Sequence, residues 1–361
     1  MKKIYTLFTL FLFAALSFAQ APAGYYDNAT GTGYTLKTQL YTIIAPHTEL
    51  TYTPGLWNLY YTSDVRADGK VWDIYSNCNF VFGSVASGGN QDNGTLGNNE
   101  CERYNREHTF PKSWFGGTVS PMYTDAFHVM PTDKKDNSMR GNLAYGKVGT
   151  ASFTTSNGTK IGNCVAPNYP YSYDVIEPAD EYKGDIARNY FYMATCYQNV
   201  ISSWQTNQAN GDTVLDGTND KVFEQWYLDL MYSWHIADPV SPKETNRNNA
   251  VYAVQGNRNP FIDHPEWVFQ IWGSALNTST FDKFANISIY PNPTNSHKIK
   301  IQTDIVLDEI DLINIDGQLM QVIKKPRLEN QTYTLDNLPQ GFYLLKITSE
   351  NQSTTKSIIV N

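Results

Sequence analysis

The hydrophobic periodicity of this chain changes character after Ser274. Before that point apolar residues recur at helical spacing in several segments, of which Ile186–Val200 is the clearest. After it, short runs alternate apolar and polar residues and are separated by turn residues. Apolar residues at helical spacing form one face of a helix, whereas apolar residues at every second position form one face of a strand. Helices and sheets pack their apolar faces in different kinds of layer. The chain is therefore expected to form an α+β domain followed by a small all-β sandwich.

The first domain is expected to combine helices with a few strands and polar loops. Strands are expected at Gly69–Tyr75 and Asp125–Val129, and loops at Val81–Asn99 and in the segment directly after Gly146. The expected helices are Thr35–Thr48, Gly55–Asp64, Ile186–Val200, Phe223–Ile236, Thr245–Gln255 and one from His264 through Trp272. The strands expected in the tail are Lys298–Gln302, Glu309–Ile315, Gln318–Lys324, Thr332–Leu335, Gly341–Ser349 and Ser353–Val360, with Asp316-Gly317 as a hairpin turn.

The first residues have the pattern of a signal peptide. Lys2 and Lys3 precede the apolar run Ile4–Phe18, and the small residues that end it predict cleavage after Ala19. A membrane anchor is the alternative, but the run is shorter than the roughly 20 apolar residues that a spanning helix needs. The expected organisation is a signal peptide at 1–19, a first domain at 20–276, a linker at 277–285 and a second domain at 286–361. The product would be an exported monomer without a membrane span.

Export makes disulfides the expected state of the cysteines. The four cysteines do not have the spacing of a zinc site, and they allow three pairings. The pairing of neighbours, Cys78 with Cys101 and Cys164 with Cys196, is the preferred one. The first of these bridges would hold the segment that leads into residues 107 and 108.

The net charge of −8 argues mildly against a general electrostatic binder of nucleic acid, because such proteins usually carry a basic surface. The stretch from Glu102 to Lys147 reverses that sign, since it holds seven basic and five acidic residues. A locally basic groove on an acidic protein is therefore compatible with this sequence.

The same central stretch holds the residues best suited to chemistry. Glu107 is a hard oxygen ligand of the kind that Mg²⁺ prefers, and His108 beside it can act as a general base near neutral pH. Neighbours in a regular strand point to opposite faces, so one site can use both only where the strand is irregular. Pro111, close behind, favours such a strand end.

A short helix is expected to follow, with Thr132 as its N-cap and Gly141 after its end. Asn137 and Arg140 are three residues apart and would share one face of it. Two strands and this helix would form a ββα metal finger. Such a unit suits phosphodiester hydrolysis, in which a metal polarises the phosphoryl group, His108 deprotonates water and an arginine neutralises phosphate charge.

Each of these residues also has an ordinary structural explanation. A Glu-His pair is more often a surface feature than a site, Asn137 could be a helix cap, and Arg140 could be a solvated charge. His128, within an apolar segment, could be a core histidine with satisfied hydrogen bonds. The residues alone leave a metal-dependent hydrolase and a purely structural segment as open alternatives.

Several spaced motifs follow one another in the first domain. They are Tyr104–Phe115, Asp125, His128, 131–133, Asn137 and 140–142, and further along 177–188, 234–240 and 255–265. Taken together, these motifs resemble the endonuclease I family of exported, sugar-nonspecific nucleases. By position, the resemblance implies that Glu107 and Asn137 bind Mg²⁺ and that His108 is the general base. It further implies a phosphate-binding or structural role for Arg140 and a positioning role for His128.

The tail has four distinctive segments, Ile289–Pro293, 316–317, Leu338–Leu345 and Lys356–Val360. On these segments it resembles the C-terminal sorting domain of exported Bacteroidetes proteins that use type IX secretion. This resemblance implies the type IX machinery as a partner and a location at the cell surface or in the medium. An accessory binding module is the alternative for this domain.

The sequence thus predicts a secreted Mg²⁺-dependent endonuclease, with Mn²⁺ or Ca²⁺ as possible substitutes for the metal. Its substrates would be DNA and RNA, bound through the backbone. The alternatives are an inactive nucleic-acid-binding protein on the same fold and a metallophosphodiesterase for small substrates.

Overall fold

The computed structural model describes residues 21–276, 287–303, 305–314, 318–328, 332–349 and 352–361. The chain divides into two compact units, one ending at Leu276 and the other beginning at Asn277, and each is described by itself. The expected signal peptide, the expected linker and the 316–317 turn lie outside the described residues. Within the described part of the chain, no helix is both long and apolar enough to cross a membrane.

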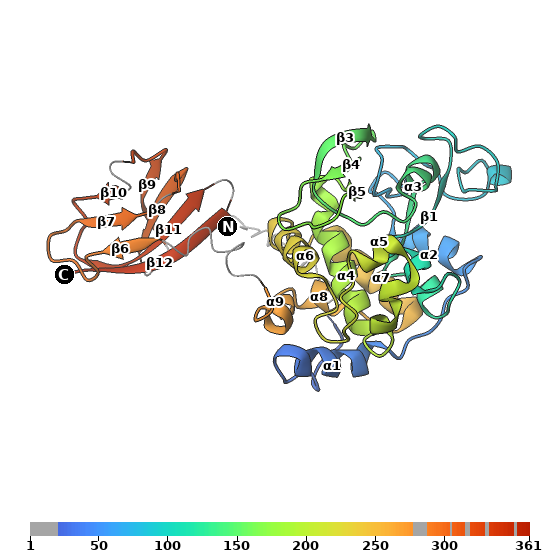
Figure 1. Ribbon diagram of the computed structural model, residues 1–361, viewed down its shortest axis with the longest axis horizontal. Coiled ribbons are helices and arrows are strands. Elements are labelled where there is room, and N and C mark those ends of the chain that lie inside the picture. The colour runs from blue at the N-terminus through green and yellow to red at the C-terminus, as the bar shows by residue number, and fades with distance from the viewer. Residues whose placement is uncertain (1–20, 277–286, 304, 315–317, 329–331, 350–351) are drawn as a thin grey trace, which may run out of the picture. The chain divides into compact units, whose positions relative to one another are not determined.

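Helix α4 lies at the centre of the N-terminal unit (Figure 1). Thirteen of its 14 residues are buried, as expected of a helix that is covered on all sides. It packs against α1, α6 and α8. The helices are α1 (Gly33–Ile44), α2 (Gly55–Ser63), α3 (Lys134–Arg140), α4 (Lys183–Cys196), α5 (Ala209–Asp212), α6 (Gln225–Ala237), α7 (Pro242–Gln255), α8 (Pro260–Asp263) and α9 (Trp267–Trp272).

A strand–loop–strand–helix unit, the ββα unit, lies against these helices. Strand β1 (Tyr104–His108) pairs with β2 (Val129–Asp133) in antiparallel register, with Glu107 opposite Met130. Helix α3 follows β2 without a break, because the side chain of Asp133 accepts hydrogen bonds from the backbone N–H groups of Lys135 and Asp136. The expected cap was one residue earlier, at 132.

Two expected strands are wrong, and side-chain hydrogen bonds explain both. Gly69–Tyr75 is not a strand, since the buried carboxylate of Asp73 accepts the Tyr75 N–H and so turns the backbone. At Asp125–Val129 the Asp125 carboxylate accepts the Phe127 N–H in the same way. Regular pairing therefore begins only at Val129.

The segment after Gly146, expected as a loop, forms a three-stranded antiparallel sheet. Its strands are β3 (Val148–Thr154), β4 (Lys160–Cys164) and β5 (Asp174–Glu177), in the order β3-β4-β5. The β3–β4 register shifts twice. At Gly162 a Cβ would lie only 2.1 Å from the Thr150 carbonyl oxygen, so a glycine is needed at this close approach.

One expected disulfide is confirmed and the other is wrong. Cys78 and Cys101 are bonded, with their Cα atoms 5.2 Å apart. Cys164 and Cys196 are both free. Cys164 is the last residue of strand β4, whereas Cys196 lies at the buried end of helix α4. Although they are consecutive cysteines in the sequence, the fold does not bring them together.

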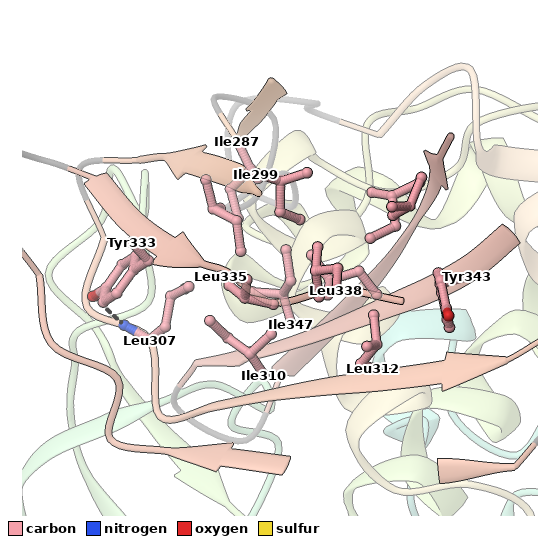
Figure 2. Close-up of a cluster of buried hydrophobic side chains, with 14 residues drawn as sticks. Ile287, Ile299, Leu307, Ile310, Leu312, Tyr333, Leu335, Leu338, Tyr343 and Ile347 are labelled. Carbon is pink, nitrogen blue, oxygen red and sulfur yellow. Dashed lines mark hydrogen bonds between the residues drawn. The ribbon is translucent and has the colours of Figure 1, made fainter. Parts of the chain in front are cut away.

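The C-terminal unit consists of two antiparallel sheets, which confirms the expected all-β fold. Their strand orders are β10-β7-β6 and β12-β11-β8-β9. Alternate residues of these strands fill one apolar core between the sheets, which Figure 2 shows. The strands are β6 (Ser288–Tyr290), β7 (Ile299–Gln302), β8 (Glu309–Asn314), β9 (Leu319–Lys324), β10 (Thr332–Leu335), β11 (Gly341–Ser349) and β12 (Gln352–Val360).

Candidate functional site

A cleft of about 540 Å³ opens beside the ββα unit. Glu107, His108 and Asn137 line it, whereas Arg140 and His128 do not. Its walls come from β1 and the segment that follows it, from α3 and the two residues after it, and from the loop before α2. The lining residues are Tyr52, Asn105, Arg106, Glu107, His108, Pro111, Lys112, Ser113, Asn137, Gly141 and Asn142. Residues from both halves of the central stretch therefore meet at one site.

Glu107 is a buried carboxylate at the inner wall of this cleft. Its Oε1 accepts a hydrogen bond from the Tyr75 hydroxyl at 3.0 Å and forms an ion pair with Arg140. Burial raises the pKa of the Glu107 carboxyl, and the Arg140 guanidinium opposes that shift. These contacts fix one oxygen and orient the carboxylate.

Arg140 lies behind Glu107 and is 1% exposed. It donates hydrogen bonds to the backbone oxygens of His108 at 2.8 Å, Thr109 at 2.7 Å and Leu143 at 3.2 Å. Its guanidinium also lies 4.6 Å from the centre of the Tyr145 ring. Arg140 is thus held entirely by protein groups and ties α3 to the end of β1.

His108 is the last residue of β1, with its ring against the cleft. Nε2 lies 2.9 Å from the Tyr123 carbonyl oxygen, which can only accept, so the proton is on Nε2 and Nδ1 carries the lone pair. The ring stacks on Tyr123 with centroids 5.2 Å apart. Burial lowers the pKa of His108 to about 3, and the neighbouring His128 is the second-largest cause of this shift. The imidazole is therefore neutral at ordinary pH.

His128 lies fully buried beside that histidine, with ring centroids 5.5 Å apart. Its Nε2 donates to the Met122 carbonyl oxygen at 2.7 Å. Because His128 does not reach the cleft, the contacts it makes are with the protein interior behind His108.

Asn137 projects from α3 toward β1. Its Nδ2 donates to Asn105 Oδ1 at 2.8 Å and to the Arg106 carbonyl oxygen at 3.4 Å. With the amino group engaged in this way, the side-chain oxygen is the atom left for a ligand. Together with the Glu107 carboxylate it offers the hard oxygen donors that Mg²⁺ prefers.

Two cations and Tyr52 complete the cleft, and sequence reasoning did not single them out. The Arg106 guanidinium lies between the Tyr52 and Trp57 rings, 3.5 and 4.2 Å from their centroids. Lys112 Nζ lies 5.7 Å from the Tyr123 ring centre. The basic excess of the central stretch pointed toward the two cations, but nothing in the sequence links residue 52 to this site.

Comparisons with known proteins agree with this arrangement. The profile of the endonuclease I family matches residues 32–266, and that of the secretion system C-terminal sorting domain matches residues 288–361. An extracellular ribonuclease of Bacillus subtilis is 35% identical over 258 residues, which cover 69% of this chain and 78% of that protein. One from Bacillus amyloliquefaciens is 33% identical over 253 residues, with the same two coverages.

A more distant relative is an endonuclease-1 of Buchnera aphidicola, 25% identical over 181 residues, 45% of this chain and 63% of that protein. The family profile covers well over half of the chain and includes the whole ββα unit. The chain belongs to the endonuclease I family and is a secreted nuclease that carries a type IX C-terminal sorting domain.

Proposed function

We propose that the chain hydrolyses phosphodiester bonds of both DNA and RNA at the 107–108–137 cleft, in a Mg²⁺-dependent reaction. The observation that carries this proposal is the convergence of Glu107, His108 and Asn137 on one cleft, with the proton of His108 fixed on Nε2. The substrate classes come from the family, whose members include endonucleases, and from relatives that are named extracellular ribonucleases.

Glu107 and Asn137 are the residues that would hold the metal. A carboxylate and an amide oxygen fit Mg²⁺, which keeps several waters when it binds few protein ligands, and Mn²⁺ or Ca²⁺ could substitute. When bound, the ion polarises the scissile phosphate and stabilises the leaving oxygen. Arg140 and Tyr75 orient the Glu107 carboxylate for this role, so we assign Arg140 a positioning role.

His108 would act as the general base. Nδ1 takes a proton from the attacking water, while Nε2–H stays bonded to the Tyr123 carbonyl oxygen. That carbonyl also stabilises the imidazolium that forms, because it accepts from the charged ring. His128 packs against the same ring and is assigned a positioning role.

Arg106 and Lys112 line the cleft and are the cations that would contact the phosphate backbone. Backbone contacts carry no sequence information, so cleavage should show little sequence preference and should weaken as salt rises. The aromatic rings on both sides of Arg106 fix its guanidinium in place, which reduces the entropy lost on binding.

The test is digestion of plasmid DNA and of RNA by the purified mature protein, with EDTA and then with added Mg²⁺. We expect loss of cleavage with EDTA and recovery with Mg²⁺, Mn²⁺ or Ca²⁺ in separate assays. His108→Ala should lower the rate at least 100-fold while the circular dichroism spectrum stays unchanged. His264→Ala is the matched control, since His264 is partly exposed and lies outside the cleft.

Three outcomes would overturn the proposal. Binding without cleavage by the wild type would indicate an inactive binding protein, and cleavage only of small phosphodiesters would indicate a different substrate class. Unchanged digestion by the His108→Ala variant would remove His108 from its assigned role.

A further inference from the structure

We propose a second metal site, for a divalent transition ion of the zinc class, formed by His47, Asp125 and Cys196. The three side chains come from the segment after α1, from the turn before β2 and from the end of α4. Their ligand atoms all lie within 4.8 Å of one another, and His47 Nε2 is 4.0 Å from Asp125 Oδ2. None of the three lines the cleft of the proposed nuclease site.

His47 presents an unused nitrogen to this cluster. Nδ1 donates to the Ala45 carbonyl oxygen at 2.8 Å, so the lone pair is on Nε2. The side chain is 2% exposed, and Nε2 is buried without a hydrogen-bond partner. A metal-binding histidine commonly has this arrangement, with one nitrogen held by a carbonyl and the other free for the ion.

Asp125 brings a negative charge whose one ion-pair contact among the described residues is with His47, the proposed fellow ligand. It is 1% exposed, and among the described residues no Lys or Arg forms an ion pair with it. Its carboxylate accepts hydrogen bonds from Tyr192, Tyr197 and Gln255. These uncharged donors hold the carboxylate in place but do not neutralise its negative charge. Buried charges are normally paired or bind a metal.

Cys196 supplies the sulfur. It is a free cysteine, 1% exposed, in a protein that is exported. On binding, the thiol would lose its proton to solvent and form a sulfur–metal bond. One thiolate, one carboxylate and a neutral imidazole then balance the two positive charges of the ion, so the buried site becomes neutral. The mixed nitrogen, sulfur and oxygen set favours zinc, whereas the oxygen pair at 107 and 137 favours Mg²⁺.

The ion would stabilise the turn at Asp125, which lies next to the proposed nuclease site. The carbonyl oxygen of Asp125 accepts the backbone N–H groups of His128 and Val129, at 3.3 and 3.2 Å. Asp125 is also two residues from Tyr123, whose carbonyl oxygen holds His108. A metal at Asp125 would thus fix the position of this turn relative to α4. Its expected role is structural.

Cobalt substitution tests the site with a readout that does not depend on activity. The mature full-length protein is stripped with a chelator and titrated with Co²⁺ in the presence of excess Mg²⁺. A thiolate bound to Co²⁺ gives an intense near-ultraviolet charge-transfer band. We expect this band to saturate at one ion per chain. Cys196→Ser should abolish it, and Cys164→Ser, which alters the other free cysteine, should keep it.

His47→Gln provides a second variant in case Cys196→Ser fails to fold. It keeps the thiol and should weaken Co²⁺ binding at least 10-fold. The site is disproved if wild-type protein gives no thiolate–cobalt band, or if the band depends on Cys164 instead of Cys196. Cleavage assays are not needed for either result, so failure of this site is distinguishable from failure of the proposed nuclease mechanism.

Discussion

At the scale of single residues, the pair Glu107 and Arg140 carries the largest energetic consequence. Both side chains are buried, and Arg140 also satisfies three backbone carbonyl oxygens. Removing one partner of a buried ion pair leaves the other charge without compensation, which typically costs about 3–5 kcal/mol. The sequence identified both residues as candidate site residues, but only the structure shows that Arg140 forms an ion pair with Glu107.

We therefore expect Arg140→Met to lower the free energy of unfolding by about 3–5 kcal/mol. Urea unfolding followed by tryptophan fluorescence measures this change, since all eight tryptophans precede residue 277. Arg66→Met is the control, because Arg66 forms a surface ion pair with Asp68 that should contribute less than about 1 kcal/mol. Equal effects of the two substitutions would contradict the buried-pair interpretation.

Lys37 is a buried lysine whose charge is costly. Its Nζ donates to the backbone oxygens of Asn219 and Asp220, and burial lowers the pKa of Lys37 to about 7, partly opposed by Asp220. Since the folded state holds this proton less tightly than the unfolded state, stability from this group is lost as pH falls from about 10 to 7.

The free energy of unfolding of the wild type, relative to Lys37→Met, should therefore rise between pH 7 and 9.5, by up to about 1.4 kcal/mol per pH unit. Urea unfolding at pH 6, 8 and 9.5 gives this difference. Lys160→Met, at an exposed lysine, is the control and should show no such slope. A pH-independent difference at position 37 would mean that the lysine stays charged in the fold.

At the scale of elements, the Cys78–Cys101 disulfide fixes the entry to β1. It spans 23 residues, and the Cys101 N–H donates to the carboxylate of Asp133, the residue that caps α3. The bridge therefore anchors the residue whose backbone hydrogen bond links the start of β1 to the start of α3. Closing a loop of this length is typically worth about 2–4 kcal/mol.

Replacing both Cys78 and Cys101 by Ser should lower the free energy of unfolding by about 2–4 kcal/mol. Urea unfolding under non-reducing conditions tests this. Cys164→Ser is the control, because Cys164 is a free cysteine that forms no disulfide. A double variant as stable as the control would show that the bridge adds nothing to the folded ββα unit.

The helices were more predictable from the sequence than the sheet β3-β4-β5. Expected and observed bounds agree closely for α2 and α6, since each is a run rich in apolar residues that is buried over much of its length. The missed sheet has mostly exposed residues in β3 and contains glycines, so it lacks the alternation that identifies a strand.

At the scale of the whole molecule, the two units have separate cores. The core of the C-terminal unit is formed only by residues after 286, and α4 and its neighbours form the other. A chain that ends at Leu276 should therefore fold and cleave nucleic acid within about twofold of the full-length rate. Digestion assays and tryptophan-monitored unfolding of both proteins measure this.

The same truncated chain should fail to reach the cell surface or medium, because the sorting domain is missing. Immunoblots of cell and medium fractions distinguish these locations. A truncated protein that is secreted normally, or one that loses more than tenfold in cleavage rate, would contradict the separation of roles between the two units.

The sequence by itself determined the properties that depend on local order: the helical and alternating patterns, the two fold classes and the motifs around Glu107 and His108. Tertiary structure decided what depends on segments far apart in the chain. It placed Tyr52 against the cleft, Arg140 behind Glu107, and Cys196 beside His47 instead of Cys164. Periodicity is a property of neighbouring residues, whereas burial, ion pairing and metal ligation arise only when distant segments pack together.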